Sequence, residues 1–184
     1  MAIKRLVIDG YGQVELNQVA FRRDGRIEAQ CALDSEDFAS IPAENGMLLA
    51  VDNVSRTIKL PADASLPIAL NYSTEHMYDD RAQGLKNFKL DIADGFYPRL
   101  GYLAVGDKFT TNCICYESTE FTTEEALVNA YEGATTLYGG ISETGAVLVS
   151  KTKPSEGPVL LAVKGTGAGS MPDGQFAIKF QVIA

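Results

Sequence analysis

Residues 175–183 read Gln-Phe-Ala-Ile-Lys-Phe-Gln-Val-Ile, a stretch in which large apolar side chains occupy every second position. The apolar residues are Phe176, Ile178, Phe180 and Val182, and they alternate with Ala177, Lys179 and Gln181. A period of two predicts a β-strand with one buried and one wetter face. The preceding Met-Pro-Asp-Gly at 171–174 predicts a turn, so the chain is expected to end inside a sheet.

Short apolar segments of the same kind recur along the whole chain. Strands are expected over residues 3–8, 13–21, 27–33, 47–51, 56–60, 67–72, 88–92, 102–105, 109–116, 135–141, 146–151 and 159–164. Turn sequences such as Asp24-Gly25, Asp52-Asn53 and Gly106-Asp107 separate them, and Asp-Gly is a strong hairpin signal. This pattern predicts an all-β fold, mainly an antiparallel sandwich or barrel.

One short helix is expected near residues 122–132. Thr122 and Glu125 have the spacing of a capping box, with Thr122 as the N-cap residue. Ala126, Leu127, Ala130 and Tyr131 would then share one face. Gly133 is a natural end for this helix.

The length of 184 residues suits a single β-rich domain over residues 1–184. No linker divides the chain and no fixed-period repeat is present. A second interpretation places residues 1–45 in a separate N-terminal hairpin or arm outside the main barrel.

The composition argues against two classes of partner. Lys and Arg number 16 and Asp and Glu 24, which leaves a net charge of -8, whereas nucleic-acid binding needs a basic face. No apolar run approaches the roughly 20 residues that span a bilayer, and the apolar part of residues 1–8 is too short to be expected to act as a signal peptide. We therefore expect no nucleic-acid or membrane partner, and synthesis in a cytosol. Reduced thiols are expected at Cys31, Cys113 and Cys115, and Cys113 and Cys115 are expected to be buried structural residues of a β-core.

The chain contains one histidine, His76, in a loop expected over residues 73–87. Imidazole and carboxylates are metal ligands, so His76 with Glu75, Asp79 and Asp80 is an alternative metal site. The spacing matches no recurrent ligand pattern, and a solvated polar loop is the favoured interpretation. We predict no catalytic residue, no resident metal and no cofactor, and therefore not an enzyme. The Gly165–Gly169 run precedes a strand rather than a helix, so it predicts a hairpin loop and not a phosphate site.

Four residues of the segment 96–102 are candidates for a protein interface: Phe96, Tyr97, Arg99 and Tyr102. Aromatic residues beside an arginine are typical of interface hot spots. The same composition also suits the edge of a core, and the sequence leaves both interpretations open.

Two segments resemble proteins of tailed-bacteriophage virions. Residues 103–112, Leu-Ala-Val-Gly-Asp-Lys-Phe-Thr-Thr-Asn, followed by a strand and Glu120-Phe-Thr-Thr, resemble a segment of such proteins. Residues 171–183 are similar to the C-termini of capsid-associated proteins such as head decoration and head fibre proteins. The resemblance covers about 30 residues, and no catalytic residue comes with it.

The resemblance implies a small β-rich structural protein of the virion, assembled in the host cytoplasm. The expected function is that of a capsid decoration, or cement, protein that binds the major capsid protein or another virion protein as a homo-oligomer, often a trimer. One alternative is a component of the tail or head–tail junction. Another is a small β-barrel that binds a metal or ligand.

Overall fold

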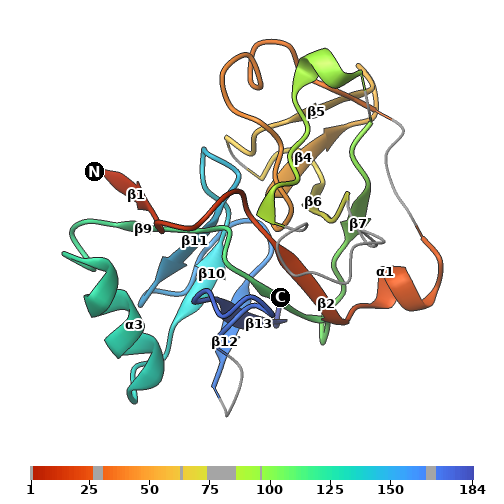
Figure 1. Cartoon of the computed structure of the whole chain (residues 1–184). Helices are drawn as coiled ribbons and strands as arrows, with labels where there is room; N and C mark the ends of the chain where they lie inside the picture. The colour runs from red at the N-terminus through yellow and green to blue at the C-terminus, as the bar shows by residue number, and fades with distance from the viewer. Residues whose placement is uncertain (1, 27–30, 63, 74–85, 96, 165–168) are drawn as a thin grey trace.

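The last strand, β13 (Ile178–Val182), lies inside an eight-stranded sheet, between β12 (Leu160–Val163) and β8 (Lys108–Thr111). Its side chains alternate between fully buried and partly exposed, starting with buried Ile178. The prediction of a strand buried on one face, at the end of the chain and within a sheet, is therefore confirmed (Figure 1).

The structure is a computed structural model that describes residues 2–26, 31–62, 64–73, 86–95, 97–164 and 169–184. In these ranges the strands form two sheets. The eight-stranded sheet curls into a half-barrel and has the order β1 (Ile3–Arg5), β9 (Ile114–Glu117), β11 (Val147–Ser150), β10 (Tyr138–Gly140), β12, β13, β8 and β2 (Val14–Gln18). The five-stranded sheet has the order β3 (Ala32–Leu33), β5 (Thr57–Lys59), β4 (Leu48–Asp52), β6 (Ile68–Asn71) and β7 (Leu100–Tyr102).

Antiparallel pairing dominates both sheets. Parallel pairs occur between β9 and β11 and between β3 and β5. The helices in the described ranges are α1 (Ala20–Arg23), α3 (Glu124–Glu132) and the 3₁₀ turn η1 (Ile92–Asp94). The predicted all-β, mainly antiparallel fold with one short helix near 122–132 is confirmed. No helix among the described residues is long and apolar enough to cross a membrane.

The eight-stranded sheet buries apolar side chains on both faces. Ile114 and Tyr116 of β9 belong to one core, which α3 covers with Leu127 and Tyr131. Cys113 and Cys115 point the other way, into a second core shared with the five-stranded sheet. Two hydrophobic cores therefore lie back to back across β9, because side chains alternate between the faces of a sheet.

Strand β4 of the five-stranded sheet is buried on both faces as well. Leu48 joins the first core, whereas Leu49 and Val51 join the second. The neighbouring strand β6 divides in the same way, with Leu70 in the first core and Ala69 in the second. The run Met47-Leu-Leu-Ala-Val51 is continuously apolar because both faces of this strand pack against protein.

Strands from residues 1–45 occupy sheet edges. Strand β1 pairs with β9 and β2 pairs with β8, at the two ends of the eight-stranded order. Strand β3 pairs with β5 at one edge of the five-stranded sheet. These pairings place the N-terminal strands within the two sheets.

The hairpin expected around Asp24-Gly25 is wrong. Strand β2 ends at Gln18, and the chain turns into α1 before reaching the Asp-Gly pair. Gly25 has φ 69° and follows the end of that helix, so the pair ends a helical turn instead of joining two strands. The Phe21 ring of α1 packs against Gly101 of β7, and this contact holds the chain in the helical turn instead of a second strand.

Three other strand predictions need correction. The strands on either side of Gly106-Asp107 belong to different sheets, so this turn is a crossover between β7 and β8. The strand expected over 109–116 breaks after Thr111, and β9 resumes at Ile114. Residues 88–92 contribute only the single bridge between Leu90 and Ala43 before η1 begins. The hairpin at Asp52-Asn53 forms as predicted. The strands expected over 135–141 and 146–151 are present as β10 and β11, which pair antiparallel.

Helix α3 starts one residue later than predicted. Its N-cap is Thr123, whose side chain accepts a hydrogen bond from the Ala126 amide at 3.2 Å, so Thr122 is not the N-cap. Gly133 ends the helix, as expected. The buried residues Leu127 and Tyr131 hold the helix against the first core.

This cap predicts a difference between two adjacent threonines. Thr123→Ala should lower the free energy of unfolding by about 1 kcal/mol, because the Ala126 amide loses its acceptor. Thr122→Ala is the matched control and should have less than half that effect. Urea unfolding followed by far-ultraviolet circular dichroism measures both, and equal losses would contradict the observed cap.

Candidate functional site

Several residues proposed from the sequence lie outside the described ranges. They are the metal-site candidates His76, Glu75, Asp79 and Asp80, and the interface candidate Phe96. Among the residues that the structure does describe, no group of three or more His, Cys, Asp and Glu side chains could hold a metal ion.

The remaining interface candidates differ in exposure. Tyr97 is 60% exposed and Arg99 is exposed just before β7. Tyr102 is half-buried and packs against the second core. The structure therefore keeps Tyr97 and Arg99 as surface residues, whereas Tyr102 belongs to the core edge.

Helix α1 adds further arginines beside β7. The Phe21 ring of α1 packs directly against Gly101 of β7: a Cβ atom added to Gly101 would lie 2.4 Å from the ring. A larger residue at 101 would therefore displace the helix. Arg22 and Arg23 of α1 and the following Arg26 are exposed. Figure 1 shows α1 at one side of the molecule next to β7. We call the exposed residues Arg22, Arg23, Arg26, Tyr97 and Arg99 the α1–β7 surface.

The Asp107 carboxylate holds the start of α1 through a hydrogen bond. One carboxylate oxygen accepts the Ala20 amide at the start of α1 at 2.8 Å, and the other accepts the Ala104 amide at 2.9 Å. The main chain of the same turn is bonded to Val182 of β13, at 2.9 Å from the Gly106 amide and 2.9 Å to the Asp107 carbonyl. Asp107 is 6% exposed. One buried carboxylate thus fixes α1 to the turn between the two sheets.

Removing this carboxylate should release α1. Asp107→Ala is expected to cost about 2 kcal/mol of unfolding free energy, because two partly buried hydrogen bonds to a charged acceptor are lost. Hydrogen exchange at Ala20 should accelerate well beyond the change in global stability. Asp24→Ala, at the exposed end of the same helix, is the control and should leave Ala20 protected; unchanged exchange in Asp107→Ala would refute the anchoring role.

A second polar cluster lies buried where the two sheets meet. Arg5 of β1 donates to both carboxylate oxygens of Glu44, at 2.8 Å from Nη1 and 2.5 Å from Nη2. The Gly12 amide also donates to Glu44, and Asn71 Nδ2 donates to the Glu44 carbonyl at 2.8 Å. The side chain of Glu44 is 6% exposed and that of Arg5 is 34% exposed. This cluster joins the edge of one sheet to the β4–β6 side of the other.

The amide side chains beside this cluster are incompletely satisfied. Gln13 and Asn112 are almost fully buried, and the Gln13 amide donates to Asn112 Oδ1 at 2.7 Å. The Oε1 atom of Gln13 and the Nδ2 atom of Asn112 have no hydrogen-bond partner among the residues that the structure describes. Thr111 adds a hydroxyl that donates to the Gln13 carbonyl at 2.6 Å. Such polar networks between sheets restrict how the sheets can pack together.

The cysteines of the second core are shielded from solvent. Cys113 Sγ accepts a hydrogen bond from Arg5 at 3.5 Å, and Cys115 donates to the Ala146 carbonyl at 3.6 Å. Burial raises the pKa of Cys113 to about 12 and the pKa of Cys115 to about 11. Since the thiolate is the nucleophilic form, these thiols are unreactive in the folded protein at neutral pH.

The shifted thiols predict alkaline destabilisation. Above the ordinary thiol pKa of 9.0 the unfolded chain loses protons that the folded chain keeps, so the free energy of unfolding should fall from about pH 9 towards pH 11. Below pH 9 these two groups add no pH dependence. Urea midpoints at pH 8 and pH 10.5 measure the fall, which should be smaller in Cys113→Ala. Identical falls in both proteins would contradict this assignment.

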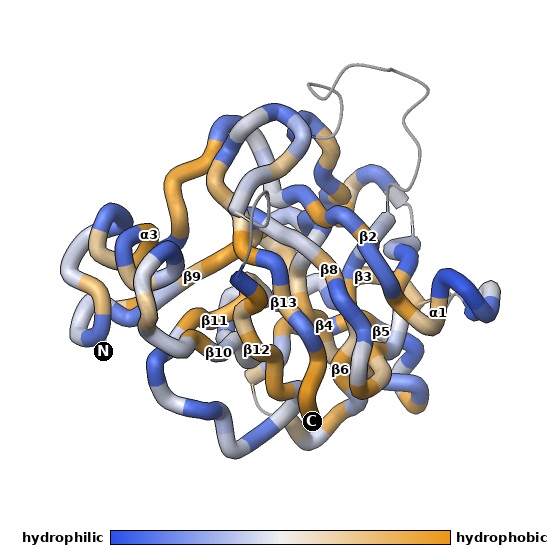
Figure 2. The backbone as a smooth tube through the Cα atoms, turned by 90° about the horizontal axis from the view of Figure 1, so that it is seen from below, coloured by the Kyte–Doolittle hydropathy of each residue, from blue (hydrophilic) through white to orange (hydrophobic). Residues whose placement is uncertain are grey.

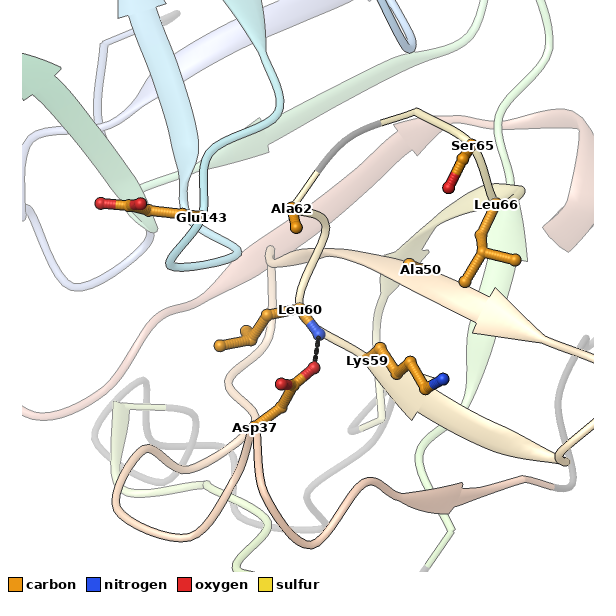
Figure 3. Close-up of a pocket in the computed structure, with 8 residues that line it drawn as sticks. All are labelled: Asp37, Ala50, Lys59, Leu60, Ala62, Ser65, Leu66 and Glu143. Atoms are coloured by element: carbon orange, nitrogen blue, oxygen red, sulfur yellow. Dashed lines mark hydrogen bonds between the residues drawn. The ribbon is translucent and has the colours of Figure 1, made fainter.

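A recess lies beside β4 and β5, next to the turn between β10 and β11. It has a volume of about 360 Å³ and is lined by Asp37, Ala50, Lys59, Leu60, Ala62, Ser65, Leu66 and Glu143. Asp37 accepts the Leu60 amide at 2.8 Å (Figure 3). Lys59 is paired with Asp52 at 3.1 Å. The Glu143 side chain points away from the recess. A neighbouring recess of about 380 Å³ shares Ala62 with it. The Asp37 and Lys59 charges are thus engaged with other protein groups.

Sequence reasoning missed Arg5, Glu44 and Asp107. Asp107 follows a glycine in a predicted turn, where a carboxylate commonly caps local amides, so its role had a local signal. Arg5 and Glu44 are 39 residues apart and carried no such signal. The known proteins add no assignment, since no protein family model, curated protein or solved structure matches this chain.

Proposed function

We propose that this chain is a non-enzymatic structural protein of a tailed-bacteriophage virion, and specifically a capsid decoration protein that binds and stabilises the head shell. The observation that carries the proposal is the position of the two resembling segments. Residues 103–112 contain β8 and residues 171–183 contain β13, and these strands pair antiparallel from Ile178–Thr111 to Gln181–Lys108.

The resembling segments thus form one contiguous unit, although about 60 residues of sequence separate them. Hydrogen bonds between the 103–107 turn and Val182 extend the unit beyond the strands. A resemblance confined to unrelated surface loops would carry less weight, because it would not correspond to a shared structural element.

The proposed activity is to bridge capsid subunits from outside. A decoration protein binds many symmetry-equivalent positions, so each contact can be weak while the shell as a whole gains stability. A homo-oligomer would strengthen this effect, and a trimer suits positions of threefold symmetry. The rigid pairing of two sheets around two cores provides a stable body for such a role.

The copy number of the chain in purified virions tests the proposal. Quantitative mass spectrometry against the major capsid protein should give hundreds of copies per virion for a decoration protein. About a dozen copies or fewer would assign it to the tail or the head–tail junction. Absence from virions, together with no sedimentation alongside capsid shells, would reject a structural role. Light scattering on the purified chain tests the trimer separately.

A further inference from the structure

The α1–β7 surface is basic in a chain whose net charge is -8. Helix α1 reads Ala-Phe-Arg-Arg and contains no acidic residue, and Arg26 follows within one turn. Arg99 is exposed two residues before Gly101, the glycine against which the Phe21 ring packs, and its carbonyl accepts the amide of Tyr72 at 3.0 Å. Figure 2 shows α1 as a strongly hydrophilic projection at the periphery of the molecule.

Most of these arginines have no carboxylate partner among the residues described. Arg23 pairs with Asp24 at 3.3 Å, whereas no ion pair in the described ranges involves Arg22, Arg26 or Arg99. Tyr97 adds an aromatic ring that is 60% exposed. Arginine and tyrosine are the residues that contribute most to protein interfaces.

The surface also stands on a rigid base. Phe21 is 3% exposed and packs against the Tyr72 ring, with ring centroids 4.8 Å apart. Asp107 fixes the first amide of α1. A surface that is ordered before binding loses less conformational entropy when it binds, and this favours affinity.

We infer that the α1–β7 surface docks onto an acidic protein surface. If the chain is a capsid decoration protein, that surface is the outer face of a capsid subunit. This identification of the partner rests on the proposed function. Charge complementarity decides the chemistry of the partner, because exposed guanidinium groups that no carboxylate of the described residues engages can bind carboxylates in bidentate geometry. A nucleic acid is a different class of partner, and the acidic composition of the chain argues against it, since nucleic-acid binding needs an extended basic face.

The test measures cosedimentation of the purified chain with capsid shells. Arg22→Glu/Arg99→Glu should weaken binding about tenfold or more, and raising the salt concentration should weaken wild-type binding in the same direction. Tyr97→Ala is a second variant that changes no charge. Its side chain is exposed, so the variant should fold normally and bind more weakly.

Arg56→Glu/Lys153→Glu is the matched control. Both residues are exposed and lie away from α1 and β7, and the control changes the net charge by the same amount as the test variant. Wild-type binding that the control retains and the test variant loses supports the inference. Equal losses in test and control overturn it, as does full binding by the test variant and Tyr97→Ala. A wild-type chain that fails to bind shells rejects the proposed function itself, and this inference with it.

Discussion

Replacing Phe180 with alanine is expected to lower the free energy of unfolding by about 3–5 kcal/mol, the range observed for large-to-small substitutions of buried aromatic residues. Phe180 is fully buried in the centre of β13. Its ring lies 5.9 Å from that of Phe109 on β8, measured between centroids. It also covers Gly139 of β10, where an added Cβ would lie 2.9 Å from the ring. The cavity left by alanine would therefore open beneath three strands.

Gln181→Ala provides the control on the same strand. Gln181 is partly exposed on the opposite face, so its truncation should change stability by less than about 0.5 kcal/mol. Chemical unfolding of both variants measures the difference. Losses of similar size would show that the alternation in residues 175–183 does not separate a buried from a wet face.

Glu44→Ala is expected to cost about 3 kcal/mol, near the lower end for breaking a buried ion pair. The substitution leaves Arg5 without its bidentate acceptor and the Gly12 amide without a partner. The loss stays near the lower end because the Arg5 side chain retains 34% exposure to solvent. Arg23→Ala, which breaks the exposed pair with Asp24, is the control and should not change stability measurably.

The double variant Arg5→Ala/Glu44→Ala tests whether the two side chains act as a pair. The double variant should lose clearly less unfolding free energy than the two single variants lose together. Each single variant leaves one charged side chain without its partner, whereas the double variant leaves none. Simple additivity of the two losses would contradict a direct coupling. The measurement requires only unfolding curves of the four proteins under the same conditions.

Much of the fold was accessible from local patterns. The alternation in β13, the hairpin at Asp52-Asn53 and the α3 segment were all predicted and are all present. Each depends on residues close in sequence, whose preferences act before any distant contact forms. The wrong N-cap of α3 is also a local error of one residue, because Thr122 and Thr123 offer nearly equivalent hydroxyls to the first turn of the helix.

The candidate site was less accessible. Tyr97 and Arg99 were proposed from composition and lie on the surface, but Tyr102 from the same segment packs on the core side. The arginines of α1 were read as part of a hairpin, because Asp24-Gly25 is a good hairpin signal in isolation. What overrode that signal was the burial of Phe21 against β7, a contact across some 80 residues of sequence.

Most strands, several turns and the acidic character of the chain follow from local sequence. The tertiary fold places β7 and β8 in different sheets, pairs Arg5 with Glu44 and holds α1 through Asp107. Strand and turn preferences depend on neighbouring residues, whereas sheet partners and buried ion pairs depend on which distant segments exclude water together. A strand buried on both faces, such as β4, illustrates the limit, because its continuous apolar sequence does not reveal which side chain enters which core.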